Sequence, residues 1–167
     1  MSELSDFFSL LDSPALIVTA RSDSGASGCL VAFATQCSIY PQRLLVCLSA
    51  LNFTTKVAST ASELGVHVLG DGQFEVASLF ATETGDETDK LAQVKWHAGV
   101  AGAPILDECA RWFEGIVVER IPLGDHVGHL LEVAEVGRGS ASGMLMKSDV
   151  TRLVAGHPAE EIRGLGG

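Results

Sequence analysis

The chain has 167 residues, 47% of them hydrophobic, and a formal net charge of −10 at pH 7. That length suits one domain with a single core, and no apolar run approaches the roughly 20 residues that a membrane-spanning helix needs. The 11 basic residues are spread along the chain without a cluster, which argues against nucleic acid or an anionic membrane as the main partner.

The first third of the chain predicts a helix followed by short buried strands. Apolar residues recur at helical spacing up to Ser13-Pro14, so residues 1–13 are expected to form an N-terminal helix. Residues 21–27 are rich in turn formers, and the strands on either side form a predicted hairpin. The polar run Thr35–Ser38 is expected to leave the second strand and connect it to the third. Short apolar runs place the first three strands at residues 15–20, 28–34 and 44–50.

The middle of the chain predicts two helices separated by one strand. Asn52 is a good N-cap for a helix over residues 52–62. A short apolar strand is expected at residues 65–69, and a second helix at residues 73–82. Acidic residues between 83 and 89 then predict a solvated loop.

The last third predicts a long hairpin. Alternating strands are expected at residues 111–121 and 127–137, joined by a turn, with one face buried. Short strands dominate the whole chain, helices are inserted, and regular strand–helix–strand alternation is absent. The predicted fold is therefore mainly β, an antiparallel β-barrel with inserted helices over residues 14–156. The Gly-rich residues 157–167 are expected to form a flexible tail.

Familiar catalytic motifs are absent from the sequence. It has no Gly-rich dinucleotide fingerprint after a strand, no P-loop, no zinc-protease helix and no hydrolase nucleophile elbow. This argues against a Rossmann dehydrogenase and an ordinary hydrolase. No secretory signal precedes the first apolar run, so a cytoplasmic protein is expected. Free thiols, rather than disulfides or zinc ligands, are then expected at Cys29, Cys37, Cys47 and Cys109.

Three polar segments are candidates for chemistry: residues 35–38, the predicted helix start at 49–56, and the turn at 124–129. The helix start offers backbone N–H groups, hydroxyls and one lysine, which together suit a phosphate; the alternative is a simple N-cap with surface threonines. In the turn, His126 and His129 are three residues apart and face opposite sides of a strand. That spacing argues against a metal site formed by both.

Short motifs follow one another in a definite order along the chain. They are Gly28, Ser38-Ile39-Tyr40-Pro41, Ser49 with Asn52 and Thr54, Phe80, Asp89-Lys90-Leu91, Trp96, Pro104-Ile105-Leu106 and Gly124-Asp125-His126. Their order and spacing resemble the flavin reductase family with the FMN-binding split β-barrel, over roughly residues 14–137. The chain departs from the family pattern at Leu30, Ala32 and Phe33, where the family has hydroxyl residues, and at Gln42, where it has a second proline.

The resemblance implies an NAD(P)H-dependent flavin reductase. Such a protein binds FMN or FAD and passes a hydride from NADH or NADPH to N5 of the flavin. It also implies a homodimer and a partner flavin-dependent monooxygenase that receives reduced flavin. His126 is the expected catalytic residue, positioning the nicotinamide. The expected cofactor-binding residues are Ala32, Phe33, Ala34, Thr35, Gln36, Cys37, Ser38, Ser49, Asn52, Phe53, Thr54, Thr55, Lys56, Phe80 and Lys90.

Two alternatives remain open on the same barrel. One is a different oxidoreductase, of the pyridoxamine-phosphate oxidase type or the deazaflavin-dependent type. The other is a non-enzymatic flavin- or haem-binding module, with His126 or His129 as an axial ligand. His67, on a predicted strand, is expected to be structural.

Overall fold

The computed structural model describes residues 3–85 and 87–153, so the predicted tail at 157–167 lies outside the described residues. The helices are α1 (Glu3–Ser9), α2 (Phe53–Ala58), α3 (Phe74–Thr82) and α4 (Lys147–Val150), with one 3-10 turn, η1 (Leu91–Gln93). The strands are β1 (Leu16–Ser22), β2 (Gly25–Val31), β3 (Phe33–Ser38), β4 (Arg43–Ser49), β5 (Glu63–Val68), β6 (Trp96–Ala98), β7 (Pro104–Leu106), β8 (Arg111–Pro122) and β9 (His126–Arg138).

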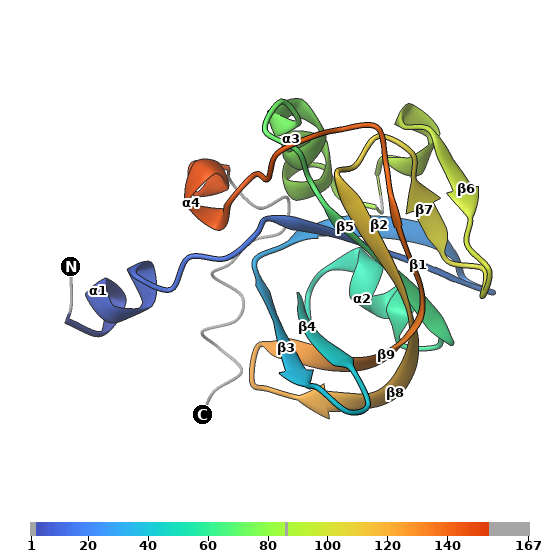
Figure 1. Cartoon of the computed structure of the whole chain (residues 1–167), viewed down its shortest axis with the longest axis horizontal. Coiled ribbons are helices and arrows are strands. Elements are labelled where there is room, and N and C mark those ends of the chain that lie inside the picture. Colours follow the sequence, from blue (N-terminus) through green and yellow to red (C-terminus); the bar gives the residue numbers. More distant parts are fainter. Residues whose placement is uncertain (1–2, 86, 154–167) are drawn as a thin grey trace.

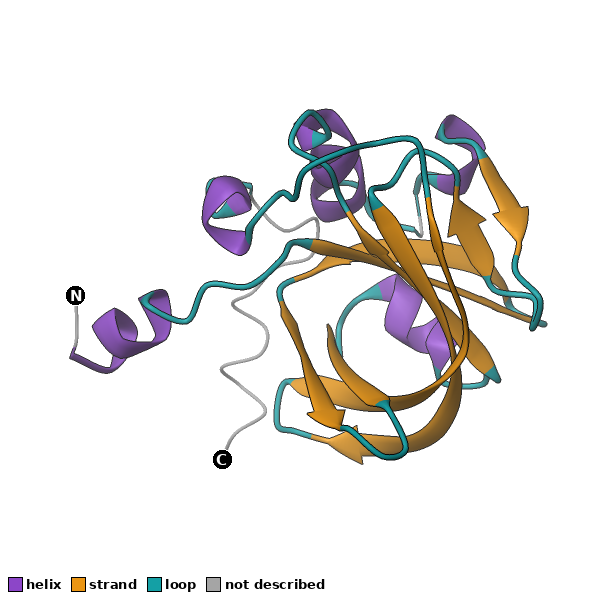
Figure 2. Cartoon of the chain, in the orientation of Figure 1, coloured by secondary structure: helices purple, strands orange, loops and turns teal. Residues whose placement is uncertain are grey.

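Seven strands form one antiparallel sheet in the order β2-β1-β5-β8-β9-β4-β3, and β6 pairs with β7 in a separate hairpin. The sheet curls around α2, whereas α3 and α4 lie outside it and α1 projects from the body (Figures 1 and 2). The prediction of an antiparallel barrel with inserted helices is confirmed. Among the helices of the described residues, none combines the length and the apolar character needed to cross a bilayer.

The chain between β1 and β4 differs from the prediction. The β1–β2 turn takes two residues, and β2 begins directly after it at Gly25, whose φ of 117° favours glycine. β2 ends at Val31 and β3 then carries Phe33–Ser38, so the prediction that Thr35–Ser38 only connects two strands is wrong. β3 lies at the edge of the sheet and pairs with β4 alone, which is where polar and exposed strand residues are tolerated.

Helix α2 fills the interior of the curled sheet. Val57 and Ala58 on the helix, and Ala61 just after it, pack against the inner faces of the strands. Arg120 of β8 donates hydrogen bonds to the carbonyl oxygens of Ala58, at 2.9 and 3.1 Å, and of Ala61. A cation that binds the free carbonyls at a helix C-terminus also complements the helix dipole. The barrel interior is therefore packed core, and ligands must bind elsewhere.

A second core lies on the other face of β1 and β5, under α3 and α4. It includes Ile17, Leu69, Ala77, Phe80, Leu106 and Val150. Because β1 has one face in each core, its residues 16–20 are all buried. This explains why the sequence there is a continuous apolar run rather than an alternating one.

His67 joins the β6–β7 hairpin to the main sheet. Its fully buried ring donates from Nδ1 to the carbonyl oxygen of Ile17 at 2.9 Å and accepts at Nε2 from the N–H of Leu106 at 3.0 Å. Only the neutral ring makes both bonds, and burial lowers the pKa of His67 to about 4. At Gly65 of β5 an added Cβ would lie 2.7 Å from the carbonyl oxygen of Pro104 in β7, so the main sheet and the hairpin meet there without room for a side chain.

The neutral state of His67 predicts a pH dependence of stability. Its pKa is about 4 in the folded protein and 6.5 in the unfolded chain, so its contribution is complete above about pH 6.5 and is lost as the pH falls toward 4. That shift corresponds to about 3 kcal/mol. We expect the unfolding free energy, measured with denaturant, to fall more steeply between these pH values in the wild type than in His67→Gln. Equal pH slopes in the two proteins would contradict this assignment.

Candidate functional site

A cavity of about 610 Å³ lies beside the start of β3. Ala32, Phe33, Ala34 and Thr35 line it, and all four are among the residues predicted to hold a flavin. The remaining lining residues come from the N-terminal segment and α4, and they are Phe8, Leu11, Asp12, Ser13 and Lys147. The cavity is mainly apolar with a few polar groups, and its volume falls within the roughly 300–1,000 Å³ of small-molecule sites.

The β3–β4 register decides which β3 side chains face outward. Ala34, opposite Val46, packs against the inner core, so its neighbours Phe33 and Thr35 lie on the face away from α2. The Phe33 side chain is 53% exposed. An exposed aromatic ring beside an apolar cavity provides a surface on which a planar ring can pack.

His126, at the start of β9, lies against Phe33. The two ring centroids are 5.1 Å apart, with the planes tilted by 58°. His126 Nδ1 is 2.8 Å from Asp125 Oδ1, and this hydrogen bond holds the pKa of Asp125 below its usual range. With Nδ1 engaged, Nε2 is the ring nitrogen left for a ligand. The structure thus brings the predicted catalytic histidine to the predicted flavin strand.

Ser49 faces the same side of the sheet as His126, its partner across the β4–β9 ladder. The Ser49 Oγ is buried and has no hydrogen-bond partner; in the described part of the chain only His129 Nε2 shares that condition. Leaving a buried hydroxyl unsatisfied costs about 1–3 kcal/mol, which a ligand oxygen would relieve. An orphaned hydroxyl beside His126 therefore fits a cofactor with several oxygen acceptors, as flavin nucleotides have.

Internal hydrogen bonds hold the start of α2. Asn52 is the N-cap, as predicted, since its Oδ1 accepts from the N–H of Thr54 at 2.9 Å. The Thr54 hydroxyl pairs with Ser27 Oγ at 2.9 Å, and the Thr55 hydroxyl donates to the carbonyl oxygen of Ser49 at 2.6 Å. Both threonines are buried. Their hydroxyls are therefore engaged inside the protein, and the alternative that both are surface residues is wrong.

Two other residues of this segment reach the surface. Phe53 is half-buried and Lys56 is exposed, with its ammonium 6.0 Å from the centroid of the Phe53 ring. Phe53 also covers Gly85, where an added Cβ would lie 2.4 Å from the phenyl ring. Lys56 is thus the cation of this segment that a ligand can reach.

Phe80 and Lys90 lie away from the cavity. Phe80 is buried in the second core. Lys90 is also buried, and its Nζ donates to the carbonyl oxygens of Phe80 at 3.4 Å and Glu83 at 3.1 Å at the end of α3. Burial lowers the pKa of Lys90. These contacts give Lys90 a capping role at the C-terminus of α3.

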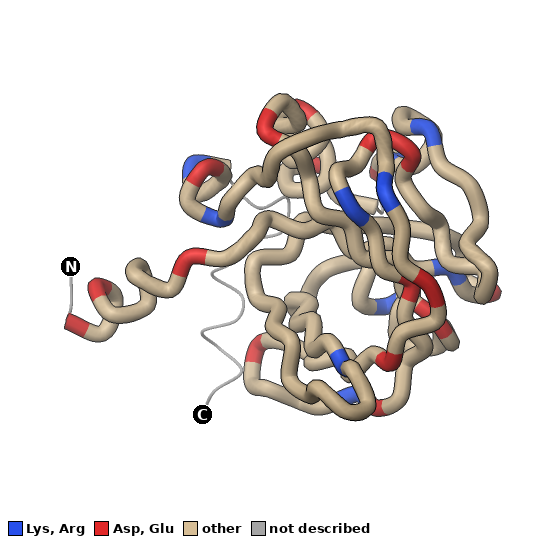
Figure 3. The backbone as a smooth tube through the Cα atoms, viewed as in Figure 1, with Lys and Arg blue, Asp and Glu red and all other residues tan. Residues whose placement is uncertain are grey.

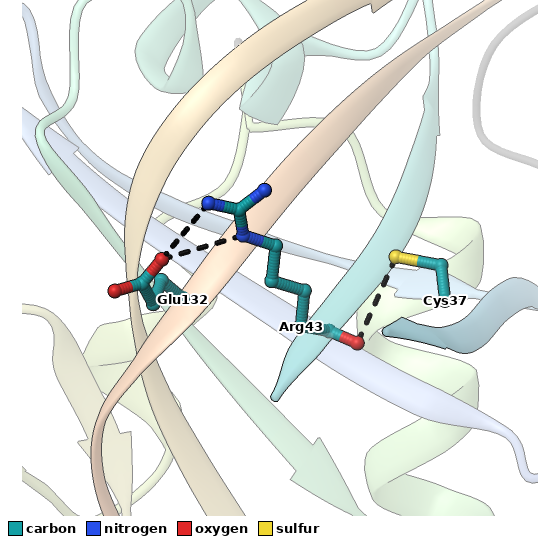
Figure 4. Close-up of polar contacts among 3 residues, drawn as sticks. All are labelled: Cys37, Arg43 and Glu132. Atoms are coloured by element: carbon teal, nitrogen blue, oxygen red, sulfur yellow. Dashed lines mark hydrogen bonds and ion pairs between the residues drawn. The ribbon is translucent and has the colours of Figure 1, made fainter. Parts of the chain in front are cut away.

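The far half of β3 is organised around a bulge at Cys37. Gln36 Nε2 donates to the Ser38 carbonyl at 3.2 Å, and Cys37 Sγ donates to the Arg43 carbonyl at 3.7 Å. Figure 4 shows this contact together with the ion pair between Arg43 and Glu132, 3.2 Å at its closest. These three predicted β3 residues continue the exposed edge of the sheet beyond the cavity.

His129 is fully buried on the inner side of β9, opposite Val46. Its Nδ1 lies 3.2 Å from the carbonyl oxygen of Val127. Burial first, and the charge of Arg120 second, lower the pKa of His129 to about 4. His129 does not line the cavity, so the structure separates the two histidines that the sequence presented as alternative haem ligands.

Five of the nine residues that line the cavity were not anticipated from the sequence. The N-terminal segment and α4 are far apart along the chain, and neither carries a recognisable binding motif. The apolar stripe of the N-terminal helix was the one available signal, because a stripe that finds no core of its own must face a cavity or a partner. Nothing in the sequence indicated that Lys147 would line the cavity. Lysines and arginines are dispersed over the whole fold, so no cluster of positive charge singles it out (Figure 3).

A sequence model described as flavin reductase like domain matches residues 8–152. The "Probable flavin reductase" of Rhizobium meliloti is 33% identical over 128 residues, which are 74% of this chain and 39% of that protein. The reductase component of the flavin-dependent trigonelline monooxygenase of Acinetobacter baylyi is 25% identical over 125 residues, with the same two shares of 74% and 39%. The chain therefore spans well under half the length of these two relatives.

Other similar proteins match over most of their length. The FMN reductase (NADH) RutF of Cronobacter sakazakii is 29% identical over 133 residues, 80% of each chain. The solved structure of the NADH:FAD oxidoreductase of Streptomyces globisporus aligns with a TM-score of 0.77 over 92% of this chain and 88% of that one, at 23% identity. At this identity the likeness concerns the fold, and it confirms the predicted split barrel.

The buried Thr54–Ser27 pair predicts a loss of stability in Thr54→Val. The substitution keeps the shape of the side chain but leaves Ser27 Oγ without its partner, at a cost of about 1–2 kcal/mol. Chemical denaturation would measure this difference. Thr60→Val, at an exposed position in the turn after α2, is the matched control and should change stability by less than about 0.5 kcal/mol. If both variants behaved alike, the buried pair would have no structural role.

Proposed function

The chain belongs to the flavin reductase-like domain family, and on this basis we propose that it is an NADH-dependent flavin reductase that binds FMN. The Cronobacter sakazakii relative is named FMN reductase (NADH), which supports FMN as the flavin and NADH as the nicotinamide nucleotide. Bound flavin would supply the redox chemistry by accepting a hydride at N5. The protein then has to hold the two ring systems against each other and keep water from between them.

The cavity at the start of β3 is the observation that carries this proposal. Its lining includes the apolar side chains of Ala32, Phe33 and Ala34, which suit a planar, largely apolar ring. β3 is an edge strand, so backbone N–H and C=O groups along its free side are available to the polar rim of the ring. Backbone contacts of this kind would compensate for the hydroxyl side chain that this chain lacks at Phe33, the first residue of β3.

We place the ribityl and phosphate end of the flavin toward the β4–α2 junction. The buried, unpartnered Ser49 Oγ supports a hydrogen bond to the ligand there. Asn52 and Lys56 are the further candidates, because Asn52 is half-buried and Lys56 is exposed. Thr54 and Thr55 would act indirectly, by keeping the start of α2 in place.

His126 is the proposed positioning residue for the nicotinamide. Asp125 orients its ring through Nδ1, and Phe33 packs against one side of it. In that arrangement Nε2 can hydrogen-bond to a carboxamide at the mouth of the cavity. Its role would be orientation, since the hydride passes directly between the two rings.

We further propose that reduced flavin is passed to a flavin-dependent monooxygenase. The Acinetobacter baylyi relative, named as the reductase component of a monooxygenase, supports this.

Purified protein mixed with FMN and NADH tests the proposed function. We expect saturable quenching of flavin fluorescence on binding, and loss of NADH absorbance that depends on both FMN and protein. Haem-containing or deazaflavin-dependent chemistry would instead show as a Soret band or as activity restricted to the deazaflavin. A protein that binds FMN but leaves NADH unoxidised would be a carrier and would refute the reductase assignment.

The His126–Asp125 geometry predicts a selective kinetic effect. His126→Ala should lower kcat/KM for NADH by roughly ten- to a hundredfold, because one orienting contact of about 1–3 kcal/mol is lost. The dissociation constant for FMN should change little, since His126 contacts the nicotinamide. Steady-state kinetics at saturating FMN, with thermal melting as a folding control, would measure both. Weakened FMN binding with unchanged NADH kinetics would instead make His126 a flavin contact.

The exposed apolar surface predicts a homodimer. Helix α1 has no buried residue, and the exposed apolar side chains on or near it and β3 include Phe7, Phe8, Leu11, Phe33, Ile39 and Tyr40. A seven-residue helix is unstable alone in water and a patch of this kind is usually covered. Light scattering after gel filtration should therefore give twice the 17.5 kDa of one chain. A monomer that binds FMN tightly would rule out a site that needs the second copy.

A further inference from the structure

One cationic side chain lines the cavity beside β3 within the described part of the chain, and it is Lys147. The chain as a whole carries a net charge of −10, so an anionic nucleotide approaches a protein that repels it on average. The cavity wall also carries the carboxylate of Asp12, whose pKa is lowered chiefly by its hydrogen bond from Ser148 and in smaller part by the charge of Lys147. The positive charge of Lys147 would offset the repulsion of an anionic ligand at this wall. Neither the family motifs nor the proposed function assigns a role to Lys147.

Lys147 is held in place by a set of contacts between the N-terminal segment and α4, which we call the terminal clasp. Its own N–H donates to the carbonyl oxygen of Ser13 at 2.7 Å, and Nζ donates to the carbonyl oxygen of Leu11. Next to it, Ser148 donates to the carboxylate of Asp12 from its hydroxyl at 2.6 Å and from its N–H at 3.1 Å. The clasp therefore fixes the lysine at the cavity although α4 is far from β3 in sequence.

The ammonium of Lys147 keeps binding capacity for an anion. It donates to the neutral carbonyl of Leu11, and no carboxylate of the described residues forms an ion pair with it within 4 Å. The nearby Asp12 is engaged by Ser148 and by the N–H of Ser13. Since an ammonium has three N–H donors, two remain for a ligand. Lys90, by contrast, is buried and donates to two carbonyls.

We propose that Lys147 binds a phosphate group of a nucleotide in this cavity. The inference rests on the proposed function, in which the FMN phosphate points to the β4–α2 junction, so the pyrophosphate of NADH is the phosphate we expect at Lys147. The 5′-phosphate of FMN would contact Lys147 only if the flavin bound in the opposite orientation. In both cases the ammonium donates charge-assisted hydrogen bonds to phosphate oxygens. The terminal clasp is then a part of the binding site that both ends of the described chain build together.

The test compares phosphate-bearing ligands with phosphate-free ones in Lys147→Gln. Dissociation constants are measured for FMN and riboflavin, and KM for NADH and for a phosphate-free N-alkyl dihydronicotinamide. Loss of the ammonium should weaken FMN or NADH by about tenfold or more and leave its phosphate-free counterpart unchanged. Whichever pair responds identifies the source of the phosphate.

Three further variants make the comparison specific. Lys147→Arg keeps the charge and should stay within about threefold of the wild type. Lys95→Gln removes a charge from an exposed lysine outside the cavity lining and should behave as the wild type does. If Lys147→Gln melts at a lower temperature than the wild type, the measurements are repeated with Lys147→Met, which keeps the aliphatic part of the side chain.

The outcomes separate this inference from the proposed function. Equal weakening of phosphate-bearing and phosphate-free ligands would make Lys147 a structural part of the clasp and overturn the inference. The inference would also be overturned if Lys147→Gln left the dissociation constants and KM values of all four ligands unchanged. The same holds if Lys95→Gln had as large an effect as Lys147→Gln. A wild type that binds neither flavin and oxidises no NADH would refute the proposed function, and the inference with it.

Discussion

The register of β4 between β3 and β9 is the constraint on which the candidate site depends. It places Phe33 opposite Cys47 on one side and His126 opposite Ser49 on the other. All four side chains consequently lie on the outer face of the sheet, where Phe33 meets His126. A slip of one residue would turn this set toward α2 and bring the inner-face residues out. The inner residues of β4, Val46 and Leu48, resist such a slip because they are fully buried in the core.

Helix α2 leaves no room for a ligand inside the barrel. Its apolar residues occupy the interior that a larger barrel would leave for a ligand, and Arg120 fixes its C-terminal end. Polar groups that remain inside, such as the ring of His129, are neutral and packed against neighbours. The outer face of β3, β4 and β9 remains, and it carries the neighbouring rings of Phe33 and His126 and the unpartnered hydroxyl of Ser49. Of these residues, Phe33 also lines the cavity.

Departures from the family pattern are consistent with this arrangement. Apolar side chains replace hydroxyls at Leu30, Ala32 and Phe33, but an edge strand keeps unpaired backbone groups along its length whatever its side chains are. The cost of an edge strand is its tendency to pair with another chain. Here the exposed Phe33 on β3 and the exposed Phe8 on α1 lie near that edge.

By itself the sequence determined the local elements and the core. Periodicity located α2 and α3, the run 15–20 indicated a buried strand, and alternation predicted the β8–β9 hairpin. The family resemblance pointed to Phe33, Ser49 and His126, which the fold does bring together. The sequence did not distinguish the edge strand β3 from a loop, because edge position depends on which strands pair.

Tertiary structure alone decided the rest of the site. Thr54, Phe80 and Lys90 are buried and make internal contacts. The contacts of the terminal clasp place Lys147 at the cavity. Local sequence cannot report either effect, since both follow from contacts between segments distant along the chain.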